Sequence, residues 1–82
     1  MKLFIKNIES SINEAVLESL FALYGEIEST KIIYDRITWE SKGYGFIEFT
    51  KKADGQKAIE AMNGKEIRGK ALSVVEADEK RK

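Results

Sequence analysis

The chain of 82 residues contains no cysteine, no histidine and no proline. Without cysteine it has neither disulfide bonds nor thiol chemistry, and without histidine it lacks the commonest general base and zinc ligand. It also lacks an excess of either charge, because 14 Lys and Arg residues balance 14 Asp and Glu residues. Zero net charge argues against a histone-like protein that binds nucleic acid through bulk charge, but it leaves local patches open. We expect no cofactor and no metal site.

Long apolar runs are missing as well. No segment approaches the roughly 18 apolar residues that would span a bilayer. Met1 leads directly into Lys-Leu-Phe-Ile without the apolar region of a signal peptide, so we expect none. We therefore expect no association with membranes. We also expect a monomer. Its expected location is cytoplasmic, or nuclear if the chain is eukaryotic or excised from a larger protein. With 43% hydrophobic residues, a chain of this length can form one modest core. We expect one domain over residues 1–77 and a short charged tail over 78–82.

The spacing of apolar residues predicts six main elements in the order strand, helix, strand, strand, helix, strand. Strands are expected at 2–8, 27–34, 43–50 and 72–75, helices at about 13–24 and 52–62, and a turn or short hairpin at 65–70. Asn13 is expected to cap the first helix and Gly25 to end it. Gly55 would weaken the second helix by up to about 1 kcal/mol relative to Ala.

This order of elements predicts an α+β fold of the ferredoxin-like β-α-β-β-α-β kind. Two split βαβ units with right-handed crossovers form a four-stranded antiparallel sheet with both helices on one face. The other face is then open to water. In the second strand, Ile27 and Ile32 can both point inward only if a bulge separates them, and Lys31 and Ile33 then point outward.

The open face is expected to carry a cluster of aromatic side chains. Strand alternation places Tyr44 and Phe46 on it, and Phe4 joins them if the first and third strands are neighbours. Four lysines flank this cluster: Lys2, Lys6, Lys31 and Lys42. Exposed clustered aromatics mark a contact surface, and flat rings between cations suit unstacked bases on a phosphate backbone.

Two segments resemble the signatures of the RNA recognition motif family. Residues 3–8, Leu-Phe-Ile-Lys-Asn-Ile, resemble its hexamer, and residues 42–49, Lys-Gly-Tyr-Gly-Phe-Ile-Glu-Phe, match its octamer with only Ile47 replacing Val. The resemblance covers essentially the whole chain and implies the sheet order 4-1-3-2. It also implies that Phe4 and Tyr44 stack on bases, that Phe46 packs against a base or sugar, and that Lys42 pairs with a phosphate. A single domain with a short tail resembles small bacterial members of the family.

Trp39 lies in the loop between the second and third strands, where the family often has Gly. Two interpretations stay open: it contacts a base or a partner, or it folds back on its own hairpin. Five acidic residues on or beside the first helix would form an acidic back that repels nucleic acid: Glu9, Glu14, Glu18, Glu26 and Glu28.

Enzymatic functions fit this sequence poorly. Ser and Thr nucleophiles have no His partner, and no Arg-containing phosphate loop follows the first strand. We predict that the chain binds single-stranded RNA through the open face and is not an enzyme. One alternative is a protein-interaction module of the same fold, although residues 66–69 lack the Phe of an Arg-x-Phe anchor. The other is binding of single-stranded DNA, which only contacts to 2′-hydroxyls would separate from RNA binding.

Overall fold

A computed structural model of the protein describes residues 1–77, so the predicted charged tail at 78–82 lies outside the described residues. The elements in chain order are β1 (Lys2–Lys6), α1 (Glu14–Phe21), the short 3₁₀ helix η1 (Ala22–Tyr24), β2 (Ile27–Tyr34), β3 (Ser41–Phe49), α2 (Lys52–Met62), β4 (Glu66–Ile67), β5 (Lys70–Ala71) and β6 (Ser73–Glu76).

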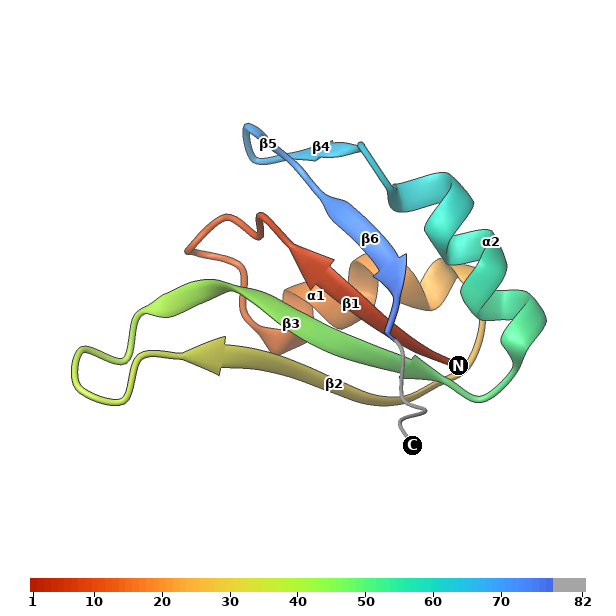
Figure 1. Ribbon diagram of the computed structural model, residues 1–82, viewed down its shortest axis with the longest axis horizontal. Helices are drawn as coiled ribbons and strands as arrows, with labels where there is room; N and C mark the ends of the chain where they lie inside the picture. The colour runs from red at the N-terminus through yellow and green to blue at the C-terminus, as the bar shows by residue number, and fades with distance from the viewer. Residues whose placement is uncertain (78–82) are drawn as a thin grey trace.

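Four strands form one antiparallel sheet in the order β2-β3-β1-β6. Because β6 is the fourth strand of this sheet, the predicted order 4-1-3-2 is confirmed. The remaining strands β4 and β5 form a small separate hairpin at the predicted turn. Both helices lie on the same side of the sheet, so the predicted ferredoxin-like α+β fold is confirmed and one sheet face stays uncovered (Figure 1).

The hydrophobic core fills the space between the sheet and the helices. Alternation along the strands places one set of apolar side chains on the sheet face that points toward the helices. Helical periodicity places the other set on the helix faces that point toward the sheet. The buried residues are Leu3, Ile5, Ile8, Ile12, Leu17, Phe21, Ile32, Ile47, Phe49, Ala58, Met62, Leu72 and Val74. The first helix starts where predicted, because Asn13 Oδ1 accepts a hydrogen bond from the backbone N–H of Val16 at 2.9 Å.

Several element ends differ from the prediction; β3, for example, begins at Ser41 rather than at Gly43. The first strand stops at Lys6, because Asn7 takes φ 62° and turns the chain out of the extended conformation. Gly25 does not follow the α-helix directly: the chain tightens into η1, and Gly25 caps η1 with φ 158° and ψ −175°, a conformation that residues with a side chain rarely adopt. At the other terminus, Glu76 belongs to β6 and pairs with Leu3, so the strand extends one residue further than expected.

The second strand contains the bulge that its sequence required. Its register against β3 shifts between Ile27 and Ser29. As a result Ile32 is buried on the core face, Ile27 packs at its margin, and Lys31 lies exposed opposite Phe46. A second shift follows between Ile32 and Tyr34, at the end of the strand.

At three glycines, Gly25, Gly45 and Gly55, an added Cβ atom would lie closer than 3.0 Å to another atom, and only at Gly45 is that atom backbone. A Cβ on Gly45 would lie 2.1 Å from the carbonyl oxygen of Lys31, so this glycine lets β2 and β3 approach. A Cβ on Gly55 would lie 2.5 Å from Met1 Sδ. Gly55 has a low helix propensity, but its lack of a side chain allows α2 to pack closely against Met1. The sequence pattern alone did not indicate this contact.

Replacing Gly45 with Ala should destabilise the protein by about 2 kcal/mol or more, because the obstacle is backbone that cannot move without breaking the β2–β3 pairing. Urea unfolding followed by circular dichroism measures this. Gly64→Ala is the matched control: its Cβ meets nothing within 4 Å, and only its φ of +86° opposes the change, at about 1 kcal/mol. If the two variants lost the same free energy of unfolding, the close approach of β2 to β3 at Gly45 would be contradicted.

Candidate nucleic-acid interface

Three aromatic rings meet on the uncovered sheet face. Phe4 of β1 lies directly opposite Phe46 of β3, with ring centroids 5.1 Å apart and planes 27° apart. Tyr44 meets the ring of Phe4 edge-on at 5.9 Å. All three side chains are half-buried, so each keeps a surface toward water. We call Phe4, Tyr44 and Phe46 the aromatic platform; the structure brings them together as the sequence predicted.

Two lysines of the first strand lie over this platform. Lys2 Nζ is 5.1 Å from the centroid of the Phe46 ring, and Lys6 Nζ is 5.9 Å from the centroid of the Phe4 ring. At these distances each ammonium is attracted to the ring by about 0.5–1 kcal/mol. Two more predicted lysines border the platform, since Lys31 pairs with Phe46 in the sheet and Lys42 precedes Tyr44 by two residues on the same strand face.

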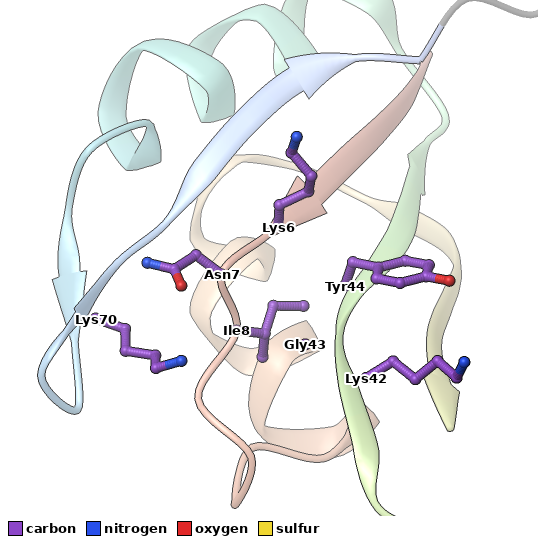
Figure 2. Close-up of a pocket in the computed structure, with 7 residues that line it drawn as sticks. All are labelled: Lys6, Asn7, Ile8, Lys42, Gly43, Tyr44 and Lys70. Atoms are coloured by element: carbon purple, nitrogen blue, oxygen red, sulfur yellow. The ribbon is translucent and has the colours of Figure 1, made fainter. Parts of the chain in front are cut away.

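A cationic recess of about 270 Å³ opens beside the platform at the end of β1 (Figure 2). It is lined by Lys6, Asn7, Ile8, Lys42, Gly43, Tyr44 and Lys70. Three of these seven residues are lysines and none is acidic. The recess therefore has the electrostatic character of an anion site, and its wall is shared with the aromatic platform through Tyr44.

Hydrogen bonds between segments that are distant in sequence hold the walls of this recess in place. Asn7 Nδ2 donates to the carbonyl oxygen of Ala71 at 2.9 Å, and the N–H of Ile8 donates to the carbonyl oxygen of Gly43 at 2.9 Å. Behind them, Arg68 Nη1 donates to Ser11 Oγ at 2.6 Å. The Asn7–Ala71 bond ties the β4–β5 hairpin to the end of β1, and the Arg68–Ser11 bond ties it to the loop before α1. The Ile8–Gly43 bond ties the segment after β1 to β3.

Sequence reasoning missed Lys70 as a member of the interface. Its side chain reaches the recess because the hairpin that carries it is tied to β1 (Figure 2). The available signal was its position just before the last strand, which pairs with β1 in the predicted sheet order. This position predicts that Lys70 lies near β1, but it does not predict how the β4–β5 hairpin folds or where the Lys70 side chain points.

A second recess, of about 380 Å³, lies on the other side of Tyr44 and is called the loop recess. Its lining is Ile33, Tyr34, Asp35, Arg36, Ile37, Lys42 and Tyr44. Lys42 and Tyr44 line both recesses, and the loop recess combines two isoleucines with the charged residues Asp35, Arg36 and Lys42. Arg36 is a further cation at this surface, and the sequence pattern did not single it out.

The β2–β3 loop has a defined geometry around Asp35. Its Oδ1 accepts hydrogen bonds from the N–H groups of Thr38 and Ile37 at 3.0 and 2.8 Å, and its carbonyl oxygen accepts one from Trp39 N at 2.8 Å. The bonds from Thr38 and Ile37, with a smaller contribution from the charge of Lys42, lower the pKa of the Asp35 carboxyl. The loop is thus shaped as an Asx-type turn.

Trp39 adopts φ 63°, the left-handed conformation that a Gly at this place would take easily. Its side chain is 73% exposed and lines neither recess. The interpretation that it folds back on its own hairpin is therefore wrong. The structure also keeps it apart from the aromatic platform, so among the predicted site residues it is the one that the fold does not bring to the sheet face.

The acidic residues of the first helix have partly structural roles. Glu14 Oε1 accepts a hydrogen bond from the hydroxyl of Tyr34 at 2.8 Å, and this bond raises the pKa of Tyr34. Glu18 Oε1 accepts one from Thr30 at 3.3 Å. Within residues 1–77, no group of three or more acidic side chains is arranged to hold a metal ion.

Comparison with known proteins relates both the sequence and the structure of this chain to one family. The family model described as the RNA recognition motif matches residues 3–73. The 29 kDa chloroplastic ribonucleoprotein B of Nicotiana sylvestris is 38% identical over 74 residues, which are 90% of this chain and 25% of the relative. This chain spans about a quarter of the length of the curated relatives that it matches.

Solved structures agree with the family model. The crystal structure of RNA-binding protein PG1 superposes with a TM-score of 0.93 at 34% identity, covering 100% of this chain and 99% of that one. A complex of Sxl-lethal protein with RNA gives a TM-score of 0.89 at 31% identity, covering 93% of this chain and 47% of that one. The matched family model, the order of strands in the sheet and the two strands that carry the signature sequences all agree with one family. The chain belongs to the RNA recognition motif family.

Proposed function

We propose that this chain binds single-stranded RNA across the open face of its sheet and catalyses no reaction. The observation that carries the proposal is the aromatic platform, with Lys2 and Lys6 over two of its rings and a lysine-rich recess at its edge. Flat rings offer stacking surfaces for unpaired bases, and the cations beside them suit the phosphates that connect those bases.

The names of similar proteins support the same function. They include a ribonucleoprotein, an RNA-binding protein and a protein solved in complex with RNA. Because the chain spans only part of its curated relatives, their complete activities do not transfer to it. The family resemblance assigns base stacking to Phe4 and Tyr44, and we keep these roles in the proposal.

In the proposed mechanism, a base replaces a lysine ammonium on a ring face. The ring then gains base stacking, worth about 1–3 kcal/mol per base, and loses the weaker attraction of the ammonium. The released lysine can move to a phosphate of the same strand. Two or three stacked bases with a few phosphate contacts give a Kd near micromolar, or about −8 kcal/mol.

The cationic recess supplies the second part of the mechanism. We assign Lys6, Lys42 and Lys70 to phosphates of the strand, because all three line a hollow that contains no carboxylate. Trp39 is proposed to contact a base or a partner from the tip of the β2–β3 loop, where it is exposed. Lys31 is proposed to contact phosphate near Phe46.

The remaining expectations concern partners and location. Binding of single-stranded DNA and docking of a protein on the platform are the alternatives that the experiments below separate from RNA binding. A monomeric state and a cytoplasmic location stay predictions, since the curated relatives carry chloroplastic and mitochondrial names. Along residues 1–77, no helix is long and apolar enough to cross a membrane.

Phe46→Ala should lower RNA affinity about 10-fold or more, since it removes a stacking surface worth at least about 1.4 kcal/mol. Fluorescence anisotropy with a labelled RNA hexamer pool measures the change. Leu23→Ala is the matched control, because this apolar side chain is 81% exposed at the end of the first helix and touches no part of the platform. A Phe46→Ala variant that binds like Leu23→Ala, with an intact circular dichroism spectrum, would contradict stacking at this ring.

Lys70→Gln should weaken RNA binding to all sequences alike and reduce the slope of log affinity against log salt by about 0.7, the share of one phosphate on a single strand. The measurement is a salt titration from low to physiological ionic strength. Lys57→Gln provides the control, since Lys57 is an exposed lysine of α2. If the two variants share one slope with the parent protein, Lys70 contacts no phosphate.

A further inference from the structure

One carboxylate lies among the cations and rings of the open face. Glu48 follows Phe46 by two residues on β3, so strand alternation puts both side chains on the same side of the sheet. The pairing register sets Glu48 between Lys2 of β1 and Ser29 of β2. Its neighbours Ile47 and Phe49 are buried in the core, and Glu48 itself is half-buried.

A negative charge at this place opposes general affinity for nucleic acid. Phosphates are negative, so a carboxylate near their path lowers the binding of every RNA sequence alike. Of the seven face residues of β1 and β3 (Lys2, Phe4, Lys6, Lys42, Tyr44, Phe46 and Glu48), only Glu48 carries negative charge. A group that weakens general binding can still contribute selectivity.

An ionised carboxylate can only accept hydrogen bonds. Within an RNA strand, the donors are the N–H groups of the bases and the 2′-hydroxyl of the ribose. Guanine presents two neighbouring donors on one edge, its N1–H and its N2 amino group, which match the two oxygens of a carboxylate. Cytosine and adenine present one amino group on that edge, and uracil presents a single N–H. Guanine is therefore the base that satisfies Glu48 best.

The spacing on β3 fits this contact. Residues two apart on one strand face are separated by about 7 Å, so the edge of a purine stacked on Phe46 can reach the Glu48 carboxylate. Lys2 lies directly across from Glu48 and 5.1 Å from the centroid of the Phe46 ring. Its ammonium is a donor on the same side, which suits the O6 acceptor beside the two guanine donors.

We propose that Glu48 selects guanine at the base that packs against Phe46. This inference rests on the proposed function, because it requires a base on the platform. It names a ligand preference that base stacking alone does not supply, since stacking tolerates every base. Glu48 then acts as a specificity-determining residue, with charge-assisted hydrogen bonds from the base to its two oxygens.

Inosine provides the sharpest probe, because it differs from guanosine only by the missing N2 amino group. The experiment compares three labelled RNA hexamers at one salt concentration: alternating uridine and guanosine, alternating uridine and inosine, and all uridine. Alternation presents a guanosine at the site in either register of the strand. The parent protein should bind the guanosine hexamer about 10-fold more tightly than the inosine hexamer, the effect of one lost charge-assisted bond.

Glu48→Gln should change the affinities in opposite directions. It should weaken guanosine binding and bring the guanosine-to-inosine ratio close to 1, because the amide presents one acceptor oxygen and one NH₂ donor in place of the two acceptor oxygens of the carboxylate. It should also strengthen all-uridine binding, by up to about 2-fold, because a repulsive charge is gone. Glu60→Gln, which removes a charge from an exposed position on α2, should leave the ratio unchanged.

Three results separate the outcomes. A parent ratio near 1, or a Glu48→Gln ratio equal to that of the parent, overturns the guanine preference. A lower unfolding temperature of Glu48→Gln with an unchanged ratio would show that Glu48 serves only the cross-strand pairing with Lys2. Failure to bind any of the three hexamers would instead contradict the proposed function itself, because stacking on the platform does not depend on guanine.

Discussion

The antiparallel register of β1 against β3 is the constraint on which the interface depends. Phe4 lies opposite Phe46 only in this register, and the same register places Leu3 against Ile47 in the core. A slip by one residue would turn the aromatic side chains into the core and the aliphatic ones into water. Burial of the aliphatic face therefore fixes the exposure of the aromatic face, so one packing requirement determines both the core and the platform.

The same constraint explains why the surrounding groups converge on the platform. Because β1 is central, its residues Lys2 and Lys6 lie over rings from both signature strands. Where β1 ends, Asn7 turns the chain and ties it to the β4–β5 hairpin, which brings Lys70 to the recess. Charge is thus arranged locally around apolar rings in a chain whose net charge is zero. Affinity from such a surface should come from stacking first and from a few phosphate contacts second.

Sequence reasoning succeeded where a periodic pattern carried the information. Alternation along 42–49 predicted which side chains share a face, and the inward direction of Ile27 and Ile32 required the bulge that is observed. It failed where the conformation of single residues decides the outcome. The positive φ of Asn7, which ends β1, has no periodic signature, and the role of Gly55 depends on contact with the distant Met1. The RNA contacts of the site residues remain predictions.

The central claim is that the open sheet face binds single-stranded RNA. An amide-shift NMR titration tests it most directly, with a degenerate RNA hexamer pool and the matching DNA pool as a control. RNA should produce shifts centred on Phe4, Lys42, Tyr44 and Phe46, and DNA should produce weaker shifts. Absence of shifts with either pool at high micromolar concentration would contradict the central claim, and the aromatic platform would then be a candidate surface for docking a protein.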